Sequence, residues 1–364
     1  MRRASARHMA PYQRAPSGGD AGDAMIELNA RRLGVAPQVA ADYEAIREGA
    51  ALVDLSARGR MRFTGAGARD ALNGVLTCDV APLAPGTGSY GAALSAKGKV
   101  LADVFVYAGR DSFLVEVPPG AWPGWTSMVG KYINPRLAAR HDETASTGEL
   151  GVFGPRGAAI LAGAIGLPAA ELELLSSFAH LDLSTEPVNV ARIPDLGVEG
   201  FRVIGPRDRV AALRSTLIAS GGREIGAEAA ECARIEAGRP LWGLDMDEST
   251  LSQEANLDQL GAISYTKGCY TGQEIVARLH FRGHVNRRLV GLRVEGAAVP
   301  ARGAELTTGD GTACGDVRSS GLSPRFGAIA LAMVRREVEV GATLQLASPG
   351  GSTSAEVAGL PFGA

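Results

Sequence analysis

The chain has 364 residues, a formal net charge of −2 and a hydrophobic fraction of 46%. This length favours two or three domains. The near-neutral charge argues against direct nucleic-acid binding, and the lack of a long apolar run argues against a membrane partner. The four cysteines are scattered and form no C-x-x-C pair, which argues against a zinc ribbon or a disulfide-stapled secreted domain and predicts a cytoplasmic protein.

The first 24 residues contain arginines, small residues, proline and glycine, but no apolar core segment. This composition excludes a secretory signal peptide. It predicts a disordered tail over residues 1–24, with an Arg-rich organelle transit peptide as the alternative.

The next 100 residues alternate between helical and strand patterns. Residues 39–51 are predicted to form an amphipathic helix, because apolar side chains recur there at helical spacing. Met61 and Phe63 alternate with arginines as in a half-buried strand, and a short helix is expected over 66–76. The runs 89–95 and 100–107 flank turn residues and predict a β-hairpin, to which residues 112–117 add a strand.

Residues 122–137 are predicted to be helical, and a strand, turn and helix follow over 148–166. Three glycines in this stretch lack the G-x-G-x-x-G spacing, which argues against a dinucleotide site. Residues 188–193 and 201–204 read as strands, and helices are expected over 207–220 and 226–238.

After residue 288 the texture changes to short strands between Gly, Asp and Pro turns, which is typical of a small antiparallel barrel or sandwich. We therefore predict an α+β protein with two units after the tail. An α+β body, possibly made of two lobes, spans residues 25–285, and a β-barrel-like domain spans residues 286–364.

The sequence KGCYTGQE over residues 267–274 is the most informative stretch. Its two glycines suit a tight turn that opens a helix, because glycine adopts positive φ without steric cost. Such turns expose N–H groups that attract anions and can lower a thiol pKa, so Cys269 is a candidate reactive thiol. The alternative is a tight turn in which the small cysteine merely packs.

The segment from residue 236 to residue 288, and KGCYTGQE above all, resembles the YgfZ-type folate-binding proteins. These are relatives of the glycine-cleavage T-protein, an aminomethyltransferase, and of mitochondrial iron–sulfur assembly factors. The resemblance implies a multi-lobed ring around a central folate pocket, with tetrahydrofolate or another folate as the bound cofactor. It also implies that the protein supports cluster assembly or repair in iron–sulfur client proteins, including those of tRNA thiolation.

The same resemblance implies which residues contact the folate. Arg234 and Glu236 match an Arg-Leu-Glu-x-Gly stretch of T-proteins, although an intrahelical or interdomain ion pair is the alternative reading of both. Glu199 is one place away from the T-protein carboxylate that holds the pterin ring, and Val198 is the other candidate for that position. The implied folate-binding residues are Tyr90, Glu199, Arg234, Glu236, Lys267 and Gln273.

One departure from T-proteins concerns catalysis. T-proteins carry adjacent aspartates in a Gly-Gly-x-x-Asp-Asp stretch, whereas this chain reads GKVLAD over residues 98–103. A methyl group cannot transfer protons, so Ala102 argues against the alternative function, tetrahydrofolate-dependent aminomethyl transfer. Asp103 remains a catalytic candidate, but adjacent strand residues face opposite sides of a sheet, so it need not substitute.

Cys269 is thus the leading catalytic candidate, with a thiolate stabilised by Lys267 and Arg278. The alternative is that Cys269 and its neighbour Tyr270 wedge the joint between domains. No metal site is predicted, because the histidines four residues apart, His280 and His284, lie in basic surroundings.

Overall fold

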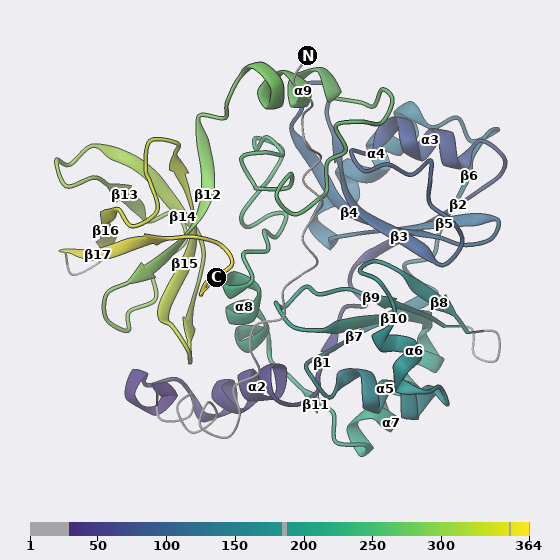
Figure 1. Cartoon of the computed structure of the whole chain (residues 1–364), viewed down its shortest axis with the longest axis horizontal. Helices are drawn as coiled ribbons and strands as arrows, with labels where there is room; N and C mark the ends of the chain where they lie inside the picture. The colour runs from purple at the N-terminus through teal and green to yellow at the C-terminus, as the bar shows by residue number, and fades with distance from the viewer. Residues whose placement is uncertain (1–28, 184–187, 349–350, 364) are drawn as a thin grey trace, which may run out of the picture.

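The computed structural model describes residues 29–183, 188–348 and 351–363, so the tail predicted over residues 1–24 lies outside the described residues. Two open sheets and one closed barrel make up the chain (Figure 1). The predicted α+β class with a C-terminal antiparallel barrel is confirmed. The domain limits at 25–285 and 286–364 stay predictions.

The first sheet has five strands in the order β3-β4-β5-β2-β6. One of its faces is apolar and packs against α3 and α4, which bury a core that includes Val104, Val115 and Trp125. The elements of this lobe are β2 (Gly59–Thr64), α3 (Ala68–Val75), β3 (Thr87–Leu94), β4 (Val100–Ala108), β5 (Ser112–Val117), η1 (Pro119–Ala121), α4 (Trp122–Tyr132) and β6 (Ala139–Asp142).

The second sheet has six strands in the order β11-β1-β7-β10-β9-β8. Its outer face packs against α5 and α7 through Val152, Phe201 and Leu217, among others. The helices of the two lobes therefore lie on the outside of the pair of sheets (Figure 1). The elements are β1 (Ala51–Asp54), β7 (Thr147–Phe153), α5 (Gly157–Ile165), α6 (Ala169–Glu173), β8 (His180–Asp182), β9 (Asn189–Arg192), β10 (Gly200–Pro206), α7 (Arg207–Ala219) and β11 (Arg223–Glu224).

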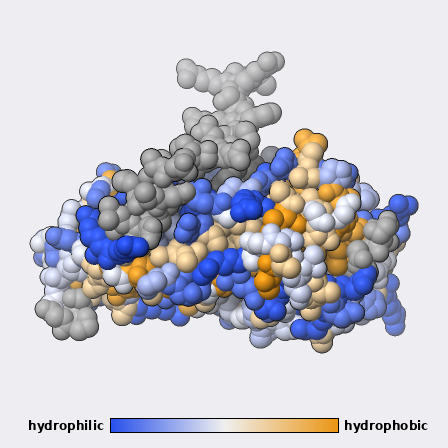
Figure 2. Space-filling view, turned by 90° about the horizontal axis from the view of Figure 1, so that it is seen from below, coloured by the Kyte–Doolittle hydropathy of each residue, from blue (hydrophilic) through white to orange (hydrophobic). Residues whose placement is uncertain are grey.

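Helix α8 packs between the barrel and the rest of the chain and contacts both β14 and α2 (Figure 1). Among the described residues, no helix is long and apolar enough to cross a bilayer. Figure 2 shows apolar areas interspersed with hydrophilic ones on one face of the molecule. The remaining elements are α2 (Pro37–Arg47), α8 (Ala227–Glu236), α9 (Gln273–Arg282), β12 (Arg287–Val294), β13 (Glu305–Thr307), β14 (Ala313–Ser323), β15 (Gly327–Arg335), β16 (Thr343–Ser348) and β17 (Gly351–Ala358).

Most predicted elements are present, and the differences have local causes. The hairpin of β3 and β4 forms as predicted, with Tyr90 opposite Phe105. Helix α4 ends at Tyr132 rather than at residue 137, because Asn134 precedes Pro135 and a residue before proline disfavours helical backbone. The sequence patterns missed β1, β6, β8 and β11, which have two to four residues each, and they also missed β17.

A layer of charged side chains lies between the two sheets, and we call it the charged layer. It consists of Arg60 and Glu116 from the five-stranded sheet and Glu149 and Arg202 from the six-stranded sheet, each at most 3% exposed. Arg202 donates to both carboxylates, and Arg60 Nη1 lies 3.2 Å from Glu149 Oε2. Tyr107 Oη donates to Glu116 Oε2 at 3.1 Å. These contacts join the two sheets through buried hydrogen bonds and ion pairs that water barely screens.

The two carboxylates of the charged layer have opposite pKa shifts. Burial alone would raise the pKa of Glu116, but the guanidinium groups of Arg202 and Arg58 outweigh it and lower the pKa to about 2. For Glu149, burial and the neighbouring charge of Glu116 prevail over three arginines and raise the pKa to about 8. Near neutral pH the raised pKa of Glu149 favours its protonated form, so Glu116 supplies the negative charge that pairs with Arg202.

Replacing Arg202 with methionine should destabilise the protein by about 3–5 kcal/mol, because buried carboxylates lose their partner. Denaturant unfolding at neutral pH measures this change. The matched control is Arg214→Met, since the side chains of Arg214 and its partner Glu224 are 45% and 43% exposed, and its expected cost is below about 1 kcal/mol. Equal losses in the two variants would contradict the role given to the charged layer.

The raised pKa of Glu149 predicts a pH dependence of stability. Between its ordinary value of 4.5 and about 8, the folded state binds a proton that the unfolded state has released. The contribution of Glu149 to the free energy of unfolding should therefore fall as the pH rises through this range. Unfolding of Glu149→Gln, which cannot titrate, should lack this fall when compared with the wild type at several pH values. Parallel profiles for the two proteins would show that Glu149 does not titrate there.

Candidate functional site

Three residues of the β3–β4 hairpin share the face of the five-stranded sheet that points toward the other sheet. Asp103 and Phe105 are two residues apart on β4 and so lie on the same face, and Tyr90 is paired with Phe105 across the hairpin. Tyr90 Oη donates to Asp103 Oδ2 at 3.1 Å. The predicted folate-binding tyrosine and the predicted catalytic aspartate are therefore in direct contact.

A third ring comes from the segment just before β8. Phe178 lies with its ring centroid 6.4 Å from that of Tyr90 and 6.0 Å from that of Phe105. Its backbone has φ of +68°, a strained value for a bulky residue, and its N–H donates to the carbonyl of Arg192. Tyr90, Phe105 and Phe178 form what we call the aromatic cluster, in which Tyr90 and Phe105 are each 4% exposed.

Asp103 combines burial with an incomplete set of hydrogen bonds. The residue is 6% exposed, and its Oδ1 accepts no hydrogen bond from any residue that the structure describes. Burial raises the pKa of Asp103, although the charge of Arg58 and the Tyr90 hydroxyl act in the opposite direction. A carboxyl group with a raised pKa and an unpartnered oxygen is suited to hold or transfer a proton.

The inference that Ala102 removes the proton-transferring group is corrected by the structure. Ala102 packs in the apolar core beneath α3 and α4, on the face of β4 opposite the aromatic cluster. A carboxylate at residue 102 would point into that core rather than toward Tyr90. Asp103 supplies the carboxyl group on the functional face, so the argument against aminomethyl transfer loses its basis.

The predicted turn in KGCYTGQE is confirmed. Helix α9 begins at Gln273, and the preceding Gly272 has φ of +84°. A Cβ on Gly272 would lie 2.7 Å from the carbonyl oxygen of Ser95, so only glycine lets the turn pack against the β3–β4 hairpin. Tyr270 is buried in the same hydrophobic cluster as Tyr90 and Phe105. Cys269, four residues before α9, is exposed.

The ammonium group of Lys267 is bound by backbone carbonyls, and the folate-binding roles of Lys267 and Gln273 stay predictions. The Lys267 ammonium group donates to the carbonyls of Asn73, Leu76 and Cys78 at 2.6 to 2.9 Å. All three of its hydrogens are thus used at the C-terminal end of α3, where a cation is favourable, and they are not available to the thiol of Cys269. Gln273 Nε2 donates to the carbonyl of Gly268 at 3.3 Å, within the same turn.

Arg234 and Glu236 tie α8 to its surroundings, as the ion-pair alternative predicts. Arg234 donates to Asp245 and to Ser319 of the barrel, at 2.7 and 2.8 Å. Glu236 accepts from Tyr43 of α2 at 2.8 Å and from Ser323 of the barrel at 2.5 Å. Their contacts account for both residues without a ligand, and their folate-binding roles stay predictions.

Glu199 makes its contacts outside the aromatic cluster. Its carboxylate pairs with Arg192 at 2.9 Å, and the neighbouring Val198 packs against the cluster that surrounds α2. Neither residue is joined by a hydrogen bond to Tyr90 or Asp103 in the contacts of the described chain. The role of Glu199 toward the pterin ring stays a prediction.

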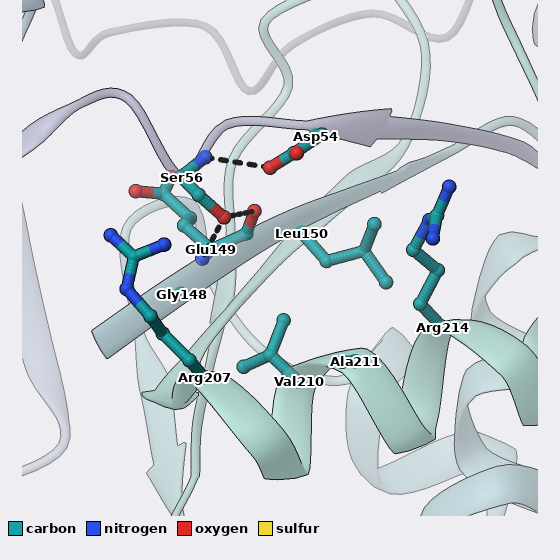
Figure 3. Close-up of a pocket in the computed structure, with 9 residues that line it drawn as sticks. All are labelled: Asp54, Ser56, Gly148, Glu149, Leu150, Arg207, Val210, Ala211 and Arg214. Carbon is teal, nitrogen blue, oxygen red and sulfur yellow. Dashed lines mark hydrogen bonds between the residues drawn. The ribbon is translucent and has the colours of Figure 1, made fainter. Parts of the chain in front are cut away.

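Two cavities of the described residues lie away from the aromatic cluster. One, of about 300 Å³, lies where Val210 of α7 faces β7, between the arginines that flank it (Figure 3). It is lined by Asp54, Ser56, Leu150, Arg207, Val210 and Arg214, among others. The second, of about 540 Å³, is in the barrel beside Cys314. The central folate pocket stays a prediction, and no metal-binding group of His, Cys, Asp or Glu is present in the described parts of the chain.

Sequence reasoning missed Phe178, Arg58 and Glu116. Arg58 lies at the turn before β2, where its Nε donates to Glu116. A usable signal was present for Glu116, because a glutamate in the middle of the apolar run FLVEV predicts a buried, paired charge. For Phe178 no local pattern gives a signal, since it reaches the hairpin from a loop far along the chain.

Comparison with known proteins agrees with this architecture. Residues 11–264 match the GCVT N-terminal domain, and residues 287–363 match the glycine cleavage T-protein C-terminal barrel domain. An aminomethyltransferase of Thermosynechococcus vestitus is 30% identical over 294 residues, which cover 80% of this chain and 79% of that protein. One of Rubrobacter xylanophilus is 30% identical over 306 residues, covering 83% and 81%.

The crystal structure of the glycine cleavage system aminomethyltransferase T from Bartonella henselae has the same fold. It superposes with a TM-score of 0.80 and 26% identity, and the match covers 89% of each chain. The KGCYTGQE resemblance to the YgfZ branch is not tested by these similarities and stays a prediction. The two domain matches, which take in both the paired sheets and the barrel, show that the chain belongs to the glycine cleavage T-protein family.

Proposed function

We propose that this protein binds tetrahydrofolate against the aromatic cluster and catalyses aminomethyl transfer. The observation that carries the proposal is the buried carboxyl group of Asp103, which contacts Tyr90 and has an unpartnered oxygen. The names of the similar proteins, aminomethyltransferases over four-fifths of the chain, support this alternative better than the iron–sulfur accessory role predicted first.

The residues present suit a reduced folate. The rings of Tyr90 and Phe105 lie 4.9 Å apart, with Phe178 beyond them, and offer apolar surface to a pterin. The unpartnered Oδ1 of Asp103 offers a hydrogen-bonding group beside those rings. A buried polar atom without a partner is costly in the free protein, and a ligand that supplies the partner removes that cost.

Asp103 would act as the proton-transferring group. Because burial raises the pKa of Asp103, the carboxyl group can hold a proton at Oδ1 while Oδ2 accepts the Tyr90 hydroxyl hydrogen. Tyr90 thereby fixes the orientation of the carboxyl group, and the second sheet shields it from water. When bound, tetrahydrofolate would supply the amine nitrogen that takes up the one-carbon unit.

Replacing Asp103 with asparagine should slow the reaction by roughly 10²–10⁴-fold, because the amide keeps the shape and the Tyr90 contact but cannot transfer a proton. The measurement is formation of methylene-tetrahydrofolate from tetrahydrofolate and an aminomethyl-lipoyl carrier protein. The control is Asp111→Asn, which changes an exposed carboxylate in the turn between β4 and β5. A wild-type rate in Asp103→Asn, or no activity in the wild type, would refute the proposal.

A second candidate function is the folate-dependent support of iron–sulfur client proteins. It is favoured by Cys269, which is exposed in the KGCYTGQE turn, whereas Cys78, Cys232 and Cys314 are buried. An exposed thiol beside the buried Tyr270 could meet a partner's cluster or form a transient mixed disulfide while the folate is held by the aromatic cluster. The two roles share the folate site, but the reactive group is the Cys269 thiol in this role and the Asp103 carboxyl group in aminomethyl transfer.

The two candidates can be separated with Cys269→Ala. If the accessory role operates, cells that carry this variant should lose client-enzyme activity under oxidative stress, while methylene-tetrahydrofolate formation in vitro stays at the wild-type rate. Cys314→Ala, which removes a buried thiol of the barrel, is the matched control. Full client-enzyme activity with Cys269→Ala would exclude the accessory role for this cysteine.

A further inference from the structure

Unpartnered polar atoms gather around the ring of Phe105. Besides Asp103 Oδ1, the buried Nη2 of Arg58 and Nε of Arg202 have no hydrogen-bond partner among the described residues. The guanidinium carbon of Arg58 lies 5.7 Å from the centre of the Phe105 ring, and that of Arg202 lies 4.4 Å from it. Buried donors are satisfied in nearly all native proteins, so such a group points to a binding partner.

Arg58 is held rigidly. Its Nε donates to Glu116, its guanidinium lies near the Phe105 ring, and its side chain is only 11% exposed. Glu116 is also paired with Arg202 and accepts a hydrogen bond from Tyr107. Its buried negative charge therefore keeps partners when Arg58 is replaced. A fixed guanidinium with a free Nη2 is pre-organised to donate to a ligand.

Arg58 and Asp103 both lie beside Phe105, since Asp103 is two residues away on β4 and the guanidinium carbon of Arg58 is 5.7 Å from the ring centre. The positive charge of Arg58 lowers the pKa of Asp103 against the rise caused by burial, as expected for groups near each other. No hydrogen bond joins the two side chains, because Oδ1 and Nη2 are both unpartnered. Each therefore has hydrogen-bonding capacity left, and both lie next to the aromatic cluster that the proposed function assigns to the folate ring.

We propose that Arg58 is a specificity-determining residue that donates from Nη2 to a carbonyl oxygen of the bound ring. This inference rests on the proposed function. Nη2 of Arg58 can only donate, so it matches a carbonyl oxygen on the edge of the ring. A reduced pterin with a 4-oxo group has such an edge. An analogue with a 4-amino group presents a donor to Arg58 and is disfavoured.

The test compares the affinities of tetrahydrofolate and tetrahydroaminopterin, in which an amino group replaces the 4-carbonyl, by anaerobic calorimetry. The wild type should prefer tetrahydrofolate by roughly tenfold or more. Arg58→Met should lose this preference, and Arg58→Lys, which keeps a donor and a charge beside Glu116, should keep part of it. Arg62→Met removes an arginine of β2, four residues from Arg58, that pairs with Glu143, and it should keep the whole preference.

The ratio of affinities separates the outcomes. A purely structural Arg58 would weaken both ligands equally and leave the ratio unchanged in Arg58→Met, which would overturn the inference alone. So would a wild type that binds both ligands equally well. A wild type that binds neither ligand would overturn the proposed function and the inference together. Unfolding curves for Arg58→Met and Arg58→Lys confirm that each variant is folded before its ratio is compared.

Discussion

The contact of Arg202 with Glu116 and Glu149 is the constraint on which the rest of the body depends. Two sheets could pack with apolar inner faces, but here both inner faces carry charges that would be very unfavourable if left unpaired. The sheets must therefore meet in the one arrangement that pairs them. Because Glu116 lies opposite Phe105 in the strand ladder, that arrangement also fixes the aromatic cluster and Asp103 against the second sheet.

On strand β4, neighbouring residues have different roles because they lie on opposite faces of the sheet. Ala102 and its alternate neighbours face the apolar core under α4, whereas Asp103 and Phe105 face the charged layer. A motif comparison does not show which face of the sheet each residue lies on. Ala102 replaces a carboxylate on the core face, whereas Asp103 lies on the face that carries Tyr90. In the structure, the retained aspartate is the one that contacts Tyr90, which is why aminomethyl transfer is the better-supported reaction.

Local patterns were enough to predict elements such as β5 and α7, whose alternation or helical spacing is complete within a few residues. They also placed the turn before α9. The contacts that define the site are non-local and have no local pattern. Lys267 reaches carbonyls about 190 residues away, and Phe178 joins a hairpin from another lobe. Short strands such as β11, which is paired in parallel with β1, exist only because a distant partner is present.

Glu236 also bears on how the chain folds during synthesis. Its buried carboxylate needs Tyr43, which is made early, and Ser323, which is made late, and its carbonyl accepts the N–H of Phe362. A nascent chain that has emerged from the ribosome only as far as α8 cannot complete these contacts. The paired sheets and the contacts of Glu236 with α2 can form first, but α8 lacks its barrel contacts until translation has produced Ser323.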